Sequence, residues 1–413
     1  MGFSKSERQV SVSIFFIIYA SLEVLRKYCF PDPLVLLAFD FLFGLVLFYF
    51  LPYRVIYLLF FINSFFLIHG LVVSIFKNQY PLFMLAGLRE INYFLGGFLL
   101  ATCSKIHFRK KDLIRLLLLG GILSGFGFLQ VILGRDSILN FSPPEFNLGS
   151  SGGHGSFVPE FEALVGDVFR PNSVFPVTGK FGMFIGMLSA MCLAIGYKVR
   201  EVREAWMFPL FWVLILINLV PFQRAVLYPL VCFLVFLGIK HLWFDNRTLL
   251  VGLIALVIGW LIVTELGQIV VERVVLFPGE VLSRLSYMNE GASLFSVDNL
   301  WGQGFGYYSN YSTLLGGGRY SDTYGGESGW LVLTASVGVG GTIIWFCVLW
   351  FESISSLFAG LFGISEEGPA FVAGFFGLIV MLWGTTHNIF GSPMILLTLG
   401  IMFGMRRVNS EWS

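Results

Sequence analysis

The chain has 413 residues, of which 56% are hydrophobic and only 12% are charged. Soluble domains carry about a quarter charged residues, so this composition excludes a water-soluble globular fold. The formal net charge of +1 provides no electrostatic attraction for nucleic acid, so we expect no nucleic-acid partner. Five cysteines occur without CxxC or Cys/His spacing, so the sequence predicts no disulfide, no metal site and no cofactor.

Apolar stretches long enough to cross a bilayer follow one another along most of the chain. A transmembrane helix needs about 20 mostly apolar residues, and fewer where its ends lie among the lipid headgroups. The first stretch resembles a signal peptide, but Glu23, Arg26 and Lys27 follow it without a small-residue cleavage site, so we predict a retained helix. The predicted helices cover residues 9–23, 33–52, 54–76, 82–103, 113–133, 173–197, 206–221, 223–239, 248–264, 328–351, 369–387 and 389–405.

These stretches predict an all-α polytopic membrane protein in which residues 1–413 form a single integral membrane domain. The count of about twelve transmembrane helices depends on two boundaries, at Pro221 and at His387-Asn388. A helix that continued through either boundary would lower the count, so the predicted range is about ten to twelve.

The distribution of lysine and arginine predicts the orientation, because these residues near helix ends prefer the cytoplasm. With the N-terminus inside, fifteen of them lie in or beside the predicted inner segments and nine lie in the outer segments, which contain far more residues. We therefore predict an even number of spans with both termini cytoplasmic. The predicted inner loop 352–368 carries no Lys or Arg and gives this orientation no support.

The same orientation places two large loops, 134–172 and 265–327, on the outer face. The first contains a Gly/Ser run from Gly149 to Ser156, which is typical of coil. The second contains short apolar stretches at 269–277 and 282–295, which we interpret as helices lying at the membrane interface.

Arg89 and Lys180 are cations inside predicted spans, and each lies in the outer half of its helix. An ionisable side chain at the bilayer centre costs about 2.5 to 3.5 kcal/mol on insertion scales, so each needs a partner or a wet cavity. Two interpretations stay open. The side chains snorkel to the outer surface, with Arg89 pairing to Glu90, or they line an outward-facing cavity.

Three further arginines lie at the predicted outer rim, namely Arg170 before helix 173–197, Arg224 at the start of helix 223–239, and Arg284 in the second loop. An arginine at a helix end is an ordinary interface anchor. However, a helix N-terminus disfavours a cation and favours an anionic ligand, so Arg224 indicates an anion nearby. Together the arginines suit bidentate binding of a phosphate or pyrophosphate.

Candidate bases lie near the same rim. Glu327 opens the helix 328–351, and Asp322 lies five residues upstream. A carboxylate in the first turn stabilises a helix whatever the function, but at the outer rim it is also placed to accept a proton from a sugar hydroxyl. His387 is the other candidate base, whereas we interpret His69, on an apolar helix face, as a satisfied buried histidine.

Several short motifs occur in a characteristic order. They are Phe169-Arg-Pro-Asn-Ser-Val-Phe175, Gln223-Arg-Ala225, Ser283-Arg284, Leu300-Trp-Gly-Gln-Gly-Phe-Gly306 and Glu327-Ser-Gly-Trp-Leu-Val-Leu-Thr-Ala-Ser-Val-Gly-Val-Gly-Gly341. This order, over roughly residues 80 to 400, resembles the O-antigen ligase and polymerase superfamily of bacterial envelope polysaccharide synthesis. Ligases of that superfamily typically carry a histidine just before the late helix, where this chain has Glu327-Ser328, so the resemblance favours a polysaccharide polymerase of the Wzy type.

The resemblance implies a metal-independent glycosyltransferase of the bacterial cytoplasmic membrane, whose donor is a polyprenyl-pyrophosphate-linked oligosaccharide. It also implies contact with membrane lipids, and with a chain-length regulator and a flippase of the same pathway. We expect the donor pyrophosphate to be bound by Arg224, Arg284, Arg170, Arg89 and Lys180. We expect the acceptor hydroxyl to be oriented by Glu327, Asp322 or His387.

Two alternatives stay open. A ligase would transfer finished glycan to a separate lipid or protein acceptor with the same donor chemistry. A flippase or transporter of lipid-linked oligosaccharide would line a central cavity with ionisable residues at several depths and have short loops on both faces. The two large outer loops, and two intramembrane cations confined to the outer half, favour an enzyme that acts at the outer surface.

Overall fold

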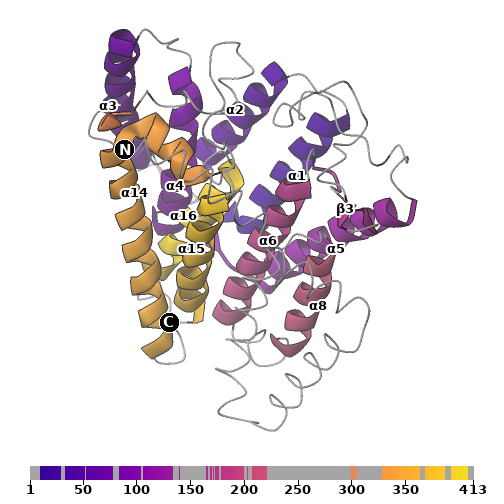
Figure 1. Cartoon of the computed structure of the whole chain (residues 1–413). Coiled ribbons are helices and arrows are strands. Elements are labelled where there is room, and N and C mark those ends of the chain that lie inside the picture. The colour runs from indigo at the N-terminus through magenta and orange to yellow at the C-terminus, as the bar shows by residue number, and fades with distance from the viewer. Residues whose placement is uncertain are drawn as a thin grey trace, which may run out of the picture.

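The computed structural model of the chain describes helices over most of the predicted membrane-spanning segments (Figure 1). The residues it describes are 10–28, 33–51, 53–77, 83–103, 106–133, 139, 164–165, 168–169, 171, 173–175, 178–199, 202, 207–220, 299–302, 304, 328–362, 368–386 and 392–407. The predicted helices 223–239 and 248–264 lie outside these residues, as do nearly all of the second loop and its predicted interfacial helices. The count of twelve therefore stays a prediction.

The described residues form ten helices, and this confirms an all-α membrane protein. Four are long and apolar enough to cross a membrane, at Val55–Val73, Lys110–Leu133, Lys180–Lys198 and Gly329–Gly360, and several shorter apolar helices accompany them. The helices are α1 (Val12–Tyr28), α2 (Pro33–Phe50), α3 (Tyr53–Lys77), α4 (Phe83–Cys103), α5 (Lys110–Leu133), α6 (Thr178–Lys198), α8 (Met207–Leu219), α14 (Gly329–Phe362), α15 (Gly368–Thr386) and α16 (Pro393–Arg407).

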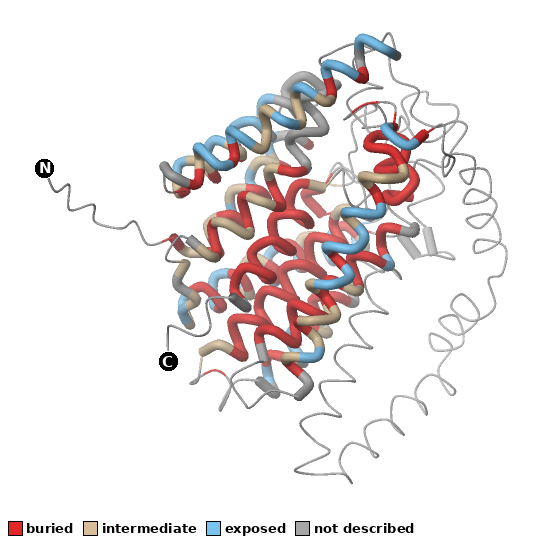
Figure 2. The backbone as a smooth tube through the Cα atoms, turned by 90° about the vertical axis from the view of Figure 1, so that its left-hand side faces the viewer, coloured by how far each residue is buried: buried red, intermediate tan, exposed pale blue. Residues whose placement is uncertain are grey.

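Helices α6 and α16 are buried over nearly their whole described length. Buried residues fill the middle of the bundle (Figure 2). Helix α6 packs against α5, α8, α15 and α16, and α16 packs along α4. The exposed side chains of α3 and α14 are large and apolar, for example Phe60, Phe61 and Phe351. Such faces are stable against lipid tails, which are as apolar as the side chains themselves.

Residue contacts fix the relative directions of the first helices. Helices α1 and α2 are antiparallel, because Phe15 packs on Phe50 while Tyr19 packs on Phe43. Helices α1 and α6 are also antiparallel, because Phe16 and Tyr19 both contact Phe184, whereas Lys27 at the end of α1 bonds to Ser173, just before α6. The starts of α2 and α6 therefore lie at the same end of the bundle.

Helices α4 and α16 run parallel in close contact. A Cβ on Gly97 would overlap the carbonyl oxygen of Leu397, and further along, a Cβ on Gly404 would meet the Cβ of Ala101 at 2.6 Å. Small residues allow the backbones to approach in this way, as is common between membrane helices. Because α2 is parallel to α4, the starts of α2, α4, α6 and α16 share one end, as the predicted alternation of spans requires. Which end faces outward stays a prediction.

Helix α14 differs from the predicted helix 328–351 in two respects. It continues to Phe362, so the prediction of an inner loop over 352–368 was wrong for most of that segment. The extra turns pack on α15, with Ser353 against Gly377 and Gly360 against Phe371, and contact with a neighbouring helix explains why they need no Lys or Arg. Helix α14 is also broken at Gly338, where φ is 77° and ψ is 177°.

Two pairs of short strands occur among the described residues, and the sequence did not predict them. Val10–Ser11 (β1) pairs in parallel with Ile106–His107 (β2), so the start of α1 is joined to the start of α5. Leu164–Val165 (β3) and Val168–Phe169 (β4) pair antiparallel within the first predicted outer loop, after the Gly/Ser run 149–156, which lies outside the described residues.

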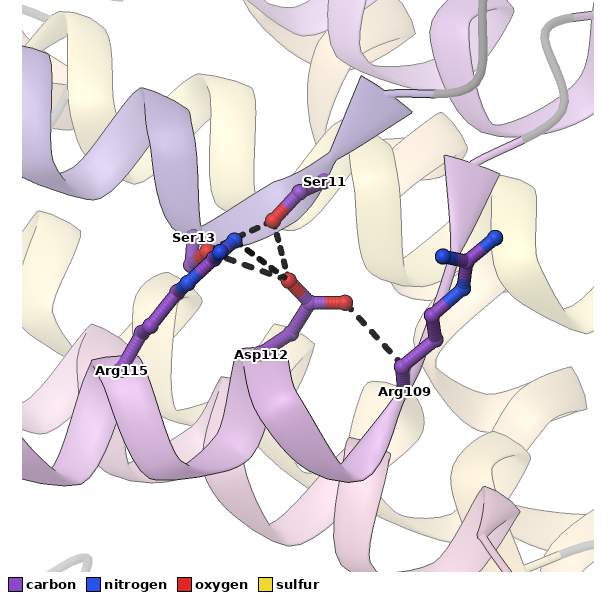
Figure 3. A network of polar contacts seen from close by, with 5 residues as sticks. All are labelled: Ser11, Ser13, Arg109, Asp112 and Arg115. Atoms are coloured by element: carbon purple, nitrogen blue, oxygen red, sulfur yellow. Dashed lines mark hydrogen bonds and ion pairs between the residues drawn. The ribbon is translucent and has the colours of Figure 1, made fainter.

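The carboxylate of Asp112 caps α5 beside the first strand pair (Figure 3). Asp112 accepts hydrogen bonds from the Arg109 backbone N–H at 3.1 Å, from the Ser13 hydroxyl at 3.2 Å and from the Ser11 hydroxyl. A carboxylate at the third helical position that binds the N–H of the residue before the helix is one half of a capping box. The cap fixes both the start of α5 and its junction with α1.

Candidate functional site

Two of the sequence motifs meet at the break in α14. Asn299 donates from Nδ2 to the carbonyl oxygen of Thr334 at 3.1 Å, and the Gly304 N–H donates to the carbonyl oxygen of Ser336 at 3.0 Å. Gly302 has a φ of 73°, and a Cβ on it would overlap the backbone N of Gly338. The turn 299–304 is therefore seated directly on the break.

The turn supplies the hydrogen bonds that the break removes. In an unbroken helix each carbonyl accepts from the N–H four residues later, so the non-helical backbone at Gly338 leaves carbonyls of the preceding turn in need of donors. Asn299 and Gly304 provide two of them. Irregular backbone at membrane depth is tolerated where protein or a wet cavity satisfies it, and here the turn supplies donors from the protein itself.

The piece of α14 before the break, Gly329–Val337, lies across the upper end of α15 in Figure 1. Ser328 donates from Oγ to the carbonyl oxygen of Gly384 at 3.3 Å, and Trp330 donates from Nε1 to that of Met381 at 2.9 Å. Both side chains are buried. The start of α14 is thus fastened to the last turns of α15.

The residues in these contacts are close in sequence to two candidate bases. Glu327 directly precedes Ser328, and His387 follows Gly384 by three residues. Glu327, His387 and Asp322 themselves lie outside the described residues. What the structure brings together is Ser328 and Trp330 on one side and Gly384 and Met381 on the other.

Two of the predicted cations lie in described helices at the same end of the bundle. Arg89 is in α4, two turns and about 12 Å before Gly97. Gly97 lies beside Leu397, which is one turn after Pro393, the first residue of α16. Along the bundle, Arg89 therefore lies about one turn further toward this end than the start of α16. Lys180 is in the first turn of α6 and is half-buried. The other predicted pyrophosphate ligands, Arg170, Arg224 and Arg284, lie outside the described residues.

Asn299 and His69 take part in contacts that no local sequence pattern predicted. The run Gly338-Val-Gly-Gly341 was a signal for a break, because paired small residues are a frequent cause of kinks. The ring of His69 on α3 lies 6.1 Å from that of Trp301 in the seated turn. Its Nδ1 is buried and has no hydrogen-bond partner among the described residues, so the interpretation of a satisfied histidine was wrong at this nitrogen.

Comparison with known protein families and with curated proteins gives no match for this chain. The family resemblance rests on the order of its motifs.

Proposed function

We propose that this chain is a polysaccharide polymerase, a glycosyltransferase that joins polyprenyl-pyrophosphate-linked oligosaccharide repeat units at the outer face of the bacterial cytoplasmic membrane. The observation that carries the proposal is the seating of the turn 299–304 on the broken helix at Ser336–Gly338. These are two motifs of the resemblance, about 30 residues apart in the chain. The piece before the break, Gly329–Val337, begins two residues after Glu327, and Ser328 and Trp330 fasten its start to the carbonyl oxygens of Gly384 and Met381 in α15.

The proposed reaction follows from the charges at this end of the bundle. The acceptor hydroxyl oxygen attacks the anomeric carbon of the donor glycan, the bond from that carbon to the pyrophosphate oxygen breaks, and polyprenyl pyrophosphate leaves with the bonding electrons. Glu327, Asp322 or His387 takes the hydroxyl proton. Arg224, Arg284, Arg170, Arg89 and Lys180 stabilise the negative charge that develops on the leaving group.

A product analysis tests this proposal. Purified protein in lipid is given a synthetic polyprenyl-pyrophosphate oligosaccharide, and the products are separated by length. We expect a ladder of glycans that differ by one repeat unit. Transfer of a single glycan to a separate lipid or protein acceptor would indicate a ligase instead, and movement of the intact lipid between leaflets without any new glycosidic bond would indicate a flippase.

The role of Arg224 has its own test. Arg224→Ala should abolish the ladder while expression is unchanged, because the leaving group loses a bidentate contact. Arg224→Lys should restore only a small part, since an ammonium offers no fork of parallel donors. Lys240→Ala, at the predicted cytoplasmic end of the same helix, is the matched control and should leave activity intact. Full activity in Arg224→Ala would remove this residue from the mechanism.

A further inference from the structure

A buried polar cluster joins three segments at the end of the bundle that holds Arg89 and Lys180. Lys27 at the end of α1 donates from Nζ to the carbonyl oxygen of Ser173 at 2.6 Å. Gln130 near the end of α5 donates from Nε2 to the same oxygen at 3.1 Å and accepts from the Ser173 N–H at 2.7 Å. All three residues are 0% exposed. We refer to Lys27, Gln130 and Ser173 as the clamp.

The clamp holds a backbone conformation that the chain would not adopt by itself. Ser173 has a φ of 50°, in the left-handed region that residues other than glycine rarely occupy. Its hydroxyl donates to the carbonyl oxygen of Leu123 at 2.8 Å, so its peptide groups and its side chain are all bound to neighbouring helices. Such an outlier persists only where the surroundings determine it fully.

Burying the Lys27 ammonium carries a desolvation cost, which its hydrogen bond to Ser173 offsets. A buried ammonium loses its hydration, and only hydrogen bonds or opposite charges compensate for it. An apolar contact would hold helices α1, α5 and α6 together equally well. The clamp instead fixes one peptide unit, and that unit lies three residues after Arg170 and seven before Lys180.

We propose that Lys27 and Gln130 are positioning residues, which hold the backbone at Ser173 and thereby place the start of α6, with Lys180 in its first turn, to bind the pyrophosphate of a lipid-linked donor. This inference rests on the proposed function for the identity of the ligand. The clamp does not touch the donor. It acts through residues 173–175 and through the first turn of α6.

A binding experiment tests the ligand side of the proposal. The probe is a glycan-free polyprenyl pyrophosphate, titrated into the full-length protein in lipid nanodiscs. Lys27→Met and Gln130→Leu should each raise its Kd about tenfold or more, the effect of misplacing one charge-assisted contact. Ser124→Ala is the matched control, because it removes another buried interhelical hydrogen bond of α5, to the carbonyl oxygen of Ile217 at 3.1 Å, outside the clamp. It should leave the Kd within twofold.

A labelling experiment tests the clamp without reference to any activity. The five native cysteines are first replaced by alanine, and Ser173→Cys is made in that background. Ser173→Cys changes only the side chain, so the backbone bonds of the clamp stay in place. Reaction with a membrane-impermeant maleimide should be slow, because position 173 is buried. Lys27→Met should speed it about tenfold, and Ser124→Ala should not. Where Lys27→Met fails to fold, Gln130→Leu decides, because it removes the side-chain hydrogen bonds to the Ser173 peptide without adding a charge.

The outcomes separate this inference from the proposed function. Faster labelling together with a raised Kd, in the clamp variants only, supports it. Unchanged labelling overturns it, and so does faster labelling with an unchanged Kd, or a wild-type protein that does not bind the pyrophosphate. Wild-type protein that binds the pyrophosphate but forms no glycan ladder would overturn the proposed function and leave the positioning role standing.

Discussion

At Gly338 the backbone takes a φ of 77°, and a Cβ there would overlap the carbonyl oxygen of Leu300. We expect Gly338→Ala to destabilise the protein by about 1 to 3 kcal/mol through backbone strain, with the overlap adding to that cost. Gly340→Ala is the control, because its Cβ would lie 3.7 Å from the same oxygen, an ordinary contact. Thermal unfolding of both variants in detergent measures the difference. Equal melting temperatures would contradict the geometry of the break.

Trp330 makes a second prediction at the scale of single residues. Its indole N–H donates to the carbonyl oxygen of Met381 in a buried site, so Trp330→Phe leaves that oxygen without this donor. The expected cost is about 1 kcal/mol. We also expect a loss of glycan product, because Glu327 lies three residues before Trp330, next to the start of the helix that this bond anchors. Trp350→Phe, on the exposed face of α14, should change neither quantity. A fall in stability without a fall in product would separate Trp330 from the proposed site.

At the scale of elements, the cap of α5 depends on one carboxylate. Asp112→Ala removes the acceptor for the Arg109 N–H and the hydroxyls of Ser11 and Ser13, and we expect a loss of about 1 to 2 kcal/mol in the free energy of unfolding. Arg115 is the control, because its side chain is 52% exposed and lies 3.8 Å from the Asp112 carboxylate. Such pairs contribute at most about 1 kcal/mol. Chemical denaturation of Asp112→Ala and Arg115→Ala compares them.

The contact between α4 and α16 gives a prediction for a helix pair. Gly97→Val should force the two helices apart, because its side chain would occupy the position of the Leu397 backbone. Overpacking of this kind typically costs about 1 to 3 kcal/mol, and more where backbone must move. Gly121→Val has nothing within 4 Å of its Cβ and serves as the control. Size-exclusion profiles in detergent should show aggregated Gly97→Val and monodisperse Gly121→Val.

At the scale of the whole molecule, orientation in the membrane is the main prediction. The positive-inside bias places both termini in the cytoplasm and the loop 265–327 outside. A phosphatase that is active only outside the cytoplasm should therefore be inactive when fused after Ser413 and active when inserted after Gly317. The reverse pattern would move the proposed site to the cytoplasmic face and exclude a donor that is polymerised outside.

Particular elements show how far sequence reasoning reached. The apolar stretches predicted α2, α3 and α4 within about two residues at each end, because hydrocarbon length is a local property of the sequence. The predicted end of α14, at residue 351, falls eleven residues short of the observed end at Phe362. The additional turns pack on α15 through Ser353 and Gly360, and this contact is not visible in the local sequence. The clamp at Ser173 joins residues up to 146 positions apart, and no local pattern contains that information.

The sequence by itself determined that this protein lies in a membrane as a bundle of helices, because backbone in hydrocarbon must satisfy its own hydrogen bonds and only long apolar helices do so here. Only the tertiary structure decided that the turn at Asn299 is seated on the break at Gly338 and that Lys27 binds the backbone at Ser173. Those contacts depend on how helices that are remote in sequence pack together, and packing is a property of the whole bundle.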